Sequence, residues 1–75
     1  AEMMRVMMCE SGGNPKAAAY DNNDKLLYAG LFQYSPDFWN GSWNPYKGGG
    51  IWDAGSQIKA TALAWSKGWR GRWGC

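Results

Sequence analysis

"MMCESGGNP", residues 7–15, marks the point where a predicted first helix ends. Before this point, apolar residues and one acid recur at intervals of three and four, which is typical of a single helical face: Met3, Val6, Met7 and Glu10. Gly12 and Gly13 favour a helix end, and Pro15 forbids a continuation. The sequence therefore predicts a helix over residues 2–10 with an acid in its last turn.

Glu10 occupies a poor position for an acid, because the free carbonyl groups of a last helical turn form the negative end of the helix dipole. It also shares the apolar face, so we expect it at the border between core and solvent. Desolvation and the dipole both favour the protonated carboxyl, which is the state that a general acid needs to protonate a glycosidic oxygen. The pattern alone leaves a second interpretation open, namely an exposed glutamate that simply ends a helix.

The rest of the chain predicts a hairpin and two further helices. A polar turn, Asp21 to Asp24, lies between two short apolar arms within residues 16–34. Ser35 and Pro36 are typical of the start of a short helix, and Asp53 is typical of the N-cap of a longer one over residues 54–67. Along the longer helix, side chains at helical spacing are expected to face the core: Ile58, Ala62, Trp65 and Trp69. The expected fold class is mainly α with a small β-hairpin (α+β).

Length and composition limit the possible classes of protein. A chain of 75 residues forms one small domain, whose core alone is usually marginal. Its two cysteines, Cys9 and Cys75, favour a disulfide over two free thiols, because such a domain needs a covalent link. The chain has no His, which argues against a zinc site, and no apolar stretch long enough to span a membrane. We expect the domain to come from a longer protein.

Basic residues are concentrated toward the C-terminus, although the net charge is only +2. Residues 51–75 contain one acid, Asp53, and a larger set of bases: Lys59, Lys67, Arg70 and Arg72. This pattern is typical of a solvated helix face, and attraction to a polyanion such as a cell wall is the alternative. The sequence contains no basic block with interleaved aromatic residues, which is the pattern that would indicate nucleic-acid binding.

Two motifs together resemble a known family. "CESGGNP" followed by "GLFQYSP" is similar to the lysozyme-like fold of lytic transglycosylases and goose-type lysozymes, in which a Glu-Ser pair ends a helix and a Gly-Leu-hydrophobic-Gln segment follows a hairpin. The likeness extends to short Cys-containing transglycosylase domains of Gram-positive bacteria and their phages. Their motifs are matched here, over nearly the whole chain, by Cys9 to Ser11, Gly30 to Gln33, Pro36 to Trp39, Asp53, and Trp73 to Cys75.

The resemblance implies a compact lysozyme-like domain over residues 1–75 that cleaves the β-1,4 bond between N-acetylmuramic acid and N-acetylglucosamine in peptidoglycan. Glu10 is the implied general acid and base. Substrate-binding roles are implied for Ser11, Gly30, Leu31, Gln33, Tyr34 and Trp39. Burial in the core is the competing interpretation for Leu31, Phe32 and Trp39. The implied partner is the glycan strand, bound by a monomeric domain on the cell wall, outside the cell or on a phage virion, without a cofactor or metal.

Two features depart from the expected pattern. The Ala-Tyr-Asn motif of many lytic transglycosylases is replaced by Ala64-Trp65-Ser66. No second carboxylate is clearly placed either, although glycosidases usually need a pair; Asp24 ranks above Asp21 and Asp37 as a candidate. A single glutamate suffices for the non-hydrolytic family reaction, which closes a 1,6-anhydro ring. The alternatives are a non-catalytic wall-binding or structural module of a phage tail, and an unrelated Trp-rich domain.

Overall fold

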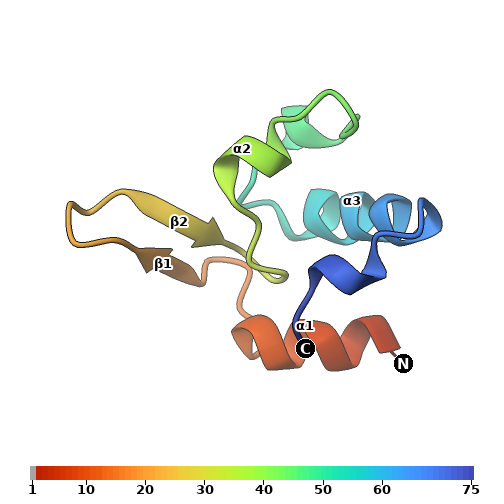
Figure 1. Cartoon of the computed structure of the whole chain (residues 1–75), viewed down its shortest axis with the longest axis horizontal. Coiled ribbons are helices and arrows are strands. Elements are labelled where there is room, and N and C mark those ends of the chain that lie inside the picture. Colours follow the sequence, from red (N-terminus) through yellow and green to blue (C-terminus); the bar gives the residue numbers. More distant parts are fainter. Residues whose placement is uncertain (1) are drawn as a thin grey trace.

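Three α-helices and a two-stranded antiparallel hairpin form the fold of residues 2–75, the part of the chain that the computed structural model describes (Figure 1). In chain order the elements are α1 (Glu2–Ser11), β1 (Ala18–Tyr20), β2 (Leu26–Ala29), α2 (Pro36–Trp39) and α3 (Ala54–Ser66), with short 3-10 turns η1 (Lys47–Gly49) and η2 (Arg70–Arg72). This confirms the predicted class, mainly α with a small hairpin.

Helix α1 ends where the glycines predicted it. Gly12 adopts φ +65°, a conformation that glycine reaches without steric cost, and its N–H donates to the carbonyl of Met8 at 2.9 Å. The Ser11 hydroxyl donates to the carbonyl of Met7 and accepts from the N–H of Gly13, which satisfies further groups at the helix end. Val6 is fully buried and Glu10 is partly buried, as the apolar face predicted.

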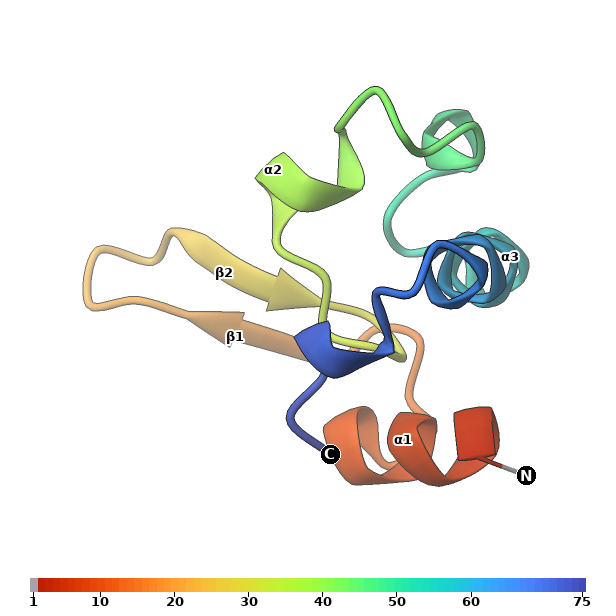
Figure 2. The same ribbon diagram turned by 45° about the vertical axis from the view of Figure 1, so that its right-hand side comes forward.

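The hairpin extends away from the helices, as Figures 1 and 2 show from two directions. Ala18 lies opposite Ala29 and Tyr20 opposite Leu26, with an irregularity in the register between them. The turn is fixed by the Asp21 carboxylate, which accepts the N–H groups of residues 23 and 25 at 2.8 and 3.0 Å. The predicted hairpin is confirmed, and its tip lies at one end of the molecule.

Both later helices begin at the predicted caps. The Ser35 hydroxyl accepts the N–H of Phe38 at 3.3 Å, and the Asp53 carboxylate accepts the N–H of Ser56 at 2.9 Å. Gly68 follows the end of α3 at φ +83°. These local signals placed each helix within a residue or two.

The buried face of α3 differs from the prediction. Its fully buried residues are Gln57, Ala60, Thr61 and Ala64, whereas Ile58 is 44% exposed and Ala62 is exposed. The expectation that Ile58 and Ala62 face the core is therefore wrong, although Trp65 and Trp69 do pack against it. The true face contains two polar residues, and these are tolerated because each is hydrogen-bonded.

Gln57 is the central polar residue of this core. Its amide oxygen accepts the N–H of Leu31 at 2.9 Å, and its amide nitrogen donates to the carbonyls of Ile51 at 2.6 Å and Pro15 at 3.2 Å. Three loops are therefore bound to α3 through one side chain. Around it lies an aromatic-rich core that includes Phe32, Tyr34, Trp39 and Trp73.

The C-terminal segment returns to α1, as both ribbon views show. Cys75 forms the predicted disulfide with Cys9, with Cα atoms 6.1 Å apart and a sequence separation of 66 residues. Arg70 adds an ion pair of 2.9 Å to Glu2 at the start of α1. A disulfide is compatible with an oxidising, extracellular location.

No helix within residues 2–75 has the length and apolar character needed to cross a lipid bilayer.

Candidate functional site

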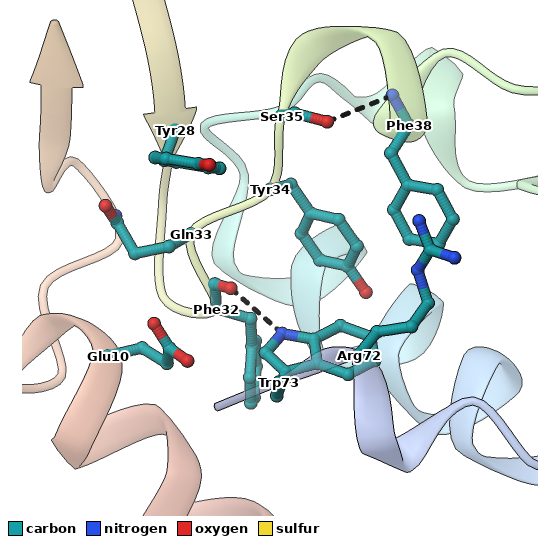
Figure 3. Close-up of a pocket in the computed structure, with 9 residues that line it drawn as sticks. All are labelled: Glu10, Tyr28, Phe32, Gln33, Tyr34, Ser35, Phe38, Arg72 and Trp73. Carbon is teal, nitrogen blue, oxygen red and sulfur yellow. Dashed lines mark hydrogen bonds between the residues drawn. The ribbon is translucent and has the colours of Figure 1, made fainter. Parts of the chain in front are cut away.

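A cavity of about 390 Å³ lies where the end of α1, the segment from β2 to α2, and the C-terminal turn meet (Figure 3). Nine residues line it: Glu10, Tyr28, Phe32, Gln33, Tyr34, Ser35, Phe38, Arg72 and Trp73. The set combines one acid, one base, one amide and several aromatic rings. Such a mixture is typical of a site that binds a polar ligand with flat apolar faces.

Glu10 projects from the last turn of α1 into this cavity (Figure 3). The neighbouring Cys9 is held to the C-terminal residue by the disulfide, so the turn that bears Glu10 is covalently fixed. Within residues 2–75, no hydrogen bond or ion pair involves its carboxylate, and no other acid lines the cavity. The carboxyl is therefore open to a ligand.

Gln33 lies next to Glu10 in the cavity wall because of a tight turn after β2 (Figure 3). Ala29 and Tyr34 exchange two backbone hydrogen bonds of 2.9 Å, which close the turn, and Gln33 takes φ +54° within it. Its amide nitrogen donates to the carbonyls of Gly30 at 2.9 Å and Ala17 at 3.3 Å. These bonds fix the side chain and leave the amide oxygen without a partner among the residues that the structure describes.

Aromatic rings form the wall between α2 and the C-terminal turn. Tyr34 stacks on Phe38 with ring centroids 5.9 Å apart, and its hydroxyl shares a 2.8 Å hydrogen bond with Thr61. Burial raises the pKa of the Tyr34 phenol to about 12, although the bond to Thr61 acts in the opposite direction. The Trp73 indole N–H donates to the carbonyl of Phe32 at 2.9 Å, which joins the C-terminal turn to the segment between β2 and α2.

Three of the residues that the sequence singled out come together in the cavity, namely Glu10, Gln33 and Tyr34. The other predicted binding residues do not line it: Ser11, Gly30, Leu31 and Trp39. Trp39 is only 1% exposed and belongs to the core, which corrects its suggested role as an aromatic surface for a ligand.

The remaining three of those residues serve the local structure. Ser11 completes the end of α1, and Leu31 is buried, with its N–H bound to Gln57. Gly30 adopts φ +84°, and a Cβ atom there would lie only 2.5 Å from the amide nitrogen of Gln57. The Gly30–Leu31 pair therefore shapes the turn that presents Gln33.

The structure does not bring a second carboxylate to Glu10. Asp24, the candidate ranked highest, is exposed in the hairpin turn and does not line the cavity. Asp21 is used by the same turn. Asp37 lines a separate hollow of about 140 Å³. A reaction that needs two carboxylates on either side of one bond therefore has only one of them here.

Sequence reasoning did not identify five of the lining residues as site residues: Tyr28, Ser35, Phe38, Arg72 and Trp73. One signal was present for the last two. Because Cys9 precedes Glu10 and Cys75 follows Trp73, the predicted disulfide already required the "WRGRW" segment to lie near the acid.

The polar groups of the site are one carboxylate, one amide, one guanidinium and hydroxyl groups among aromatic rings. In the described part of the chain, no three His, Cys, Asp or Glu side chains come together as metal ligands. Comparisons with family models, with curated proteins and with solved structures found no match.

Proposed function

We propose that this chain is a lysozyme-like domain that cleaves the β-1,4 glycosidic bond between N-acetylmuramic acid and N-acetylglucosamine in peptidoglycan, as lytic transglycosylases do. The observation that carries the proposal is the meeting of Glu10 and Gln33 in one open, aromatic-walled cavity, in which Glu10 is the sole carboxylate among residues 2–75. These are residues of the two motifs that resemble that family, separated by 23 positions in sequence but adjacent at the site.

Glu10 acts first as an acid and then as a base. Its carboxyl donates a proton to the glycosidic oxygen, and the bond between this oxygen and C1 breaks with its electron pair going to the oxygen. The sugar is left with cationic character at C1. The oxygen of its own 6-hydroxyl then bonds to C1, and the hydroxyl proton passes to the Glu10 carboxylate. The acid is regenerated, a 1,6-anhydro ring is formed, and no water is consumed.

The single carboxylate supports this non-hydrolytic route over inversion by water. An inverting glycosidase needs a second carboxylate about 6.5–9.5 Å away to activate water. Asp24, Asp21 and Asp37 all lie outside the lining of the cavity. In the proposed route the nucleophile belongs to the substrate, so one residue can serve both steps.

The rest of the cavity fits a sugar ring in size and chemistry. The amide oxygen of Gln33 can accept a hydrogen bond from a hydroxyl or acetamido N–H group, while the exposed ring of Tyr28 offers aromatic surface. The disulfide favours work in an oxidising location, which suits an enzyme of the cell wall or of a virion.

The decisive experiment compares Glu10→Gln with the unmodified protein on purified cell walls. The amide cannot donate a carboxylic proton, so we expect solubilisation of the walls to fall to a few per cent or less at unchanged melting temperature. Mass spectrometry of the released fragments should find each product lighter by one water molecule than the same fragment with a reducing end. The matched control is Glu2→Gln, which changes the other glutamate of α1, lies outside the cavity and should stay active.

Retention of cleavage by Glu10→Gln would contradict the assignment of the acid. Products with reducing ends would keep Glu10 but overturn the non-hydrolytic route.

A second candidate function is a non-catalytic wall-binding or structural module on the same fold. The observation that favours it is that no polar side chain or second acid holds the Glu10 carboxylate within residues 2–75. The two candidates differ in a simple assay. A binding module would sediment with cell walls and release no fragments. Its Glu10→Gln variant would bind the walls as well as the unmodified protein.

A further inference from the structure

Two arginines of the turn η2 have different surroundings. Arg70 is engaged by the fold: its guanidinium bonds Glu2 at 2.9 Å and the carbonyl of Cys75 at 2.8 Å, and lies 5.0 Å from the ring centroid of Trp65. Arg72 has no hydrogen bond or ion pair from its side chain to any residue in the range 2–75. Instead, Arg72 lines the same cavity as Glu10.

Stacking holds the Arg72 guanidinium in a defined place. Its central carbon lies 4.1 Å from the centroid of the Phe38 ring, which is itself packed on Tyr34 and Trp43. Such stacking uses the flat face of the guanidinium and leaves the N–H groups at its edges free. Those edges have the spacing that binds both oxygens of a carboxylate at once.

The Arg72 guanidinium lies across the cavity from Glu10. Figure 3 shows Glu10 and Arg72 on opposite sides of the cavity, with Phe32 and Trp73 between them. Arg72 is the only base among the lining residues. A ligand that contacts Glu10 at one end therefore places its other end near the Arg72 guanidinium. This positive charge is held in position by stacking and has no partner within residues 2–75.

We propose that Arg72 binds a carboxylate of the substrate and thereby selects glycan strands that carry carboxylates over neutral ones. The inference rests on the proposed function, since it takes the ligand of the cavity to be a peptidoglycan strand. The carboxylate has two possible sources with the same chemistry: the lactyl group of N-acetylmuramic acid, or the peptide attached to it. Arg72 is a specificity-determining residue in this scheme and takes no part in proton transfer.

The test measures binding, so that it does not depend on cleavage. Dissociation constants are measured by calorimetry in the Glu10→Gln background, with and without Arg72→Gln. Three soluble probes are used: a peptide-free oligosaccharide with free lactyl carboxylates, the same oligosaccharide with its carboxylates converted to amides, and a peptide-bearing oligosaccharide. Loss of a charge-assisted pair at a solvent-accessible site is expected to weaken binding about tenfold.

The pattern across the probes decides the source. If the lactyl carboxylate is bound, Arg72→Gln weakens binding of the free acid about tenfold and leaves the amide unchanged. If the peptide carboxylate is bound, only the peptide-bearing probe loses affinity. Arg72→Lys keeps the charge without the flat fork and should lose part of the effect. The matched control is Lys67→Gln, which also removes a cation placed over an aromatic ring, 5.6 Å from the centroid of Trp69, but outside the cavity.

The inference would be overturned if Arg72→Gln weakened binding of the acid and amide probes equally and caused no selective loss of affinity for the peptide-bearing probe. It would also be overturned if Arg72→Gln changed none of the dissociation constants. The proposed function fails separately. If Glu10→Gln still cleaves walls while the selective loss of affinity is found, the acid is misassigned and the carboxylate site stands. If none of the probes binds the Glu10→Gln protein, the inference is rejected, whereas cleavage of walls that depends on Glu10 would still support the proposed function.

Discussion

Helices α1 and α3 are held in the molecule in opposite ways. Helix α3 completely buries four residues, and its polar members Gln57 and Thr61 are hydrogen-bonded inside the core. Helix α1 completely buries only Val6 and is joined to the C-terminal segment by a disulfide and an ion pair. The candidate acid is on α1. The helix that bears the candidate acid therefore depends on links to distant residues, whereas the helix that lines no part of the cavity organises the core.

The largest effect is expected from removing the covalent link of α1. In the chain-entropy model, a loop of this length is worth up to about 4 kcal/mol, so the double variant Cys9→Ala, Cys75→Ala should show a strongly lowered melting temperature. Wall cleavage should fall with it, because the turn that bears Glu10 loses its anchor. Reductant should have the same effect on the parent protein and none on the double variant. An unchanged melting temperature would contradict this account of α1.

The corresponding break in α3 is Gln57→Leu. This change keeps most of the volume but leaves the N–H of Leu31 and the carbonyl of Ile51 without partners, at an expected cost of about 2–4 kcal/mol in the free energy of unfolding. Urea unfolding curves measure it. The control is the neighbouring Ile58→Ala, which should cost less than about 1 kcal/mol because Ile58 is 44% exposed. The reverse order would contradict the buried face of α3.

Alkaline pH should destabilise the protein through Tyr34, which joins α3 to the cavity wall by its hydrogen bond to Thr61. The pKa of Tyr34 is raised by burial from 10.0 to about 12, so the folded state disfavours its ionised form. This contribution to stability is complete below pH 10 and is lost as the pH rises through about 12. Tyr34→Phe should lose about 1 kcal/mol at neutral pH, through the bond to Thr61, and should flatten the alkaline decline. A decline as steep as that of the parent protein would count against Tyr34 as its source.

The smallest effect concerns the exposed ion pairs of α1. Hydrogen bonds from Arg5 and Arg70 lower the pKa of Glu2 from 4.5 to about 2. The resulting stabilisation is present above pH 4.5 and is lost as the pH falls toward 2. Glu2→Gln should lower the melting temperature slightly at neutral pH and converge with the parent protein at the acid end. Thermal unfolding at a series of pH values tests it, and parallel curves would contradict the linkage.

Local signals account for most of the fold that could be predicted. The end of α1, the polar turn of the hairpin and the caps at Ser35 and Asp53 are each fixed by residues within one turn of the feature. The buried face of α3 could not be read this way. Gln57 appears polar in sequence, and its burial is possible only because Leu31 and Ile51, from other segments, supply its partners.

The residues of the candidate site also fall into two groups, those that a sequence pattern identified and those placed by contacts between distant segments. Glu10 was found because an acid at a helix end is locally unfavourable, and Gln33 because it belongs to a motif. Phe38 and Arg72 were missed because their place in the cavity follows from contacts between α2 and the C-terminal turn, which no local pattern encodes. Trp39 was given a binding face because the resemblance implies one, and the structure instead supports the competing interpretation, burial in the core.

The disulfide also sets the route by which mechanical tension crosses the molecule. A pull between residues 2 and 75 runs along the first turns of α1 to Cys9 and then directly through the sulfur bridge to Cys75. Residues 10–74, which include every residue that lines the cavity, lie outside this covalent path. Stretching the oxidised chain can therefore extend the backbone only before Cys9, whereas reduction would also free the enclosed segment, residues 10–74, to extend.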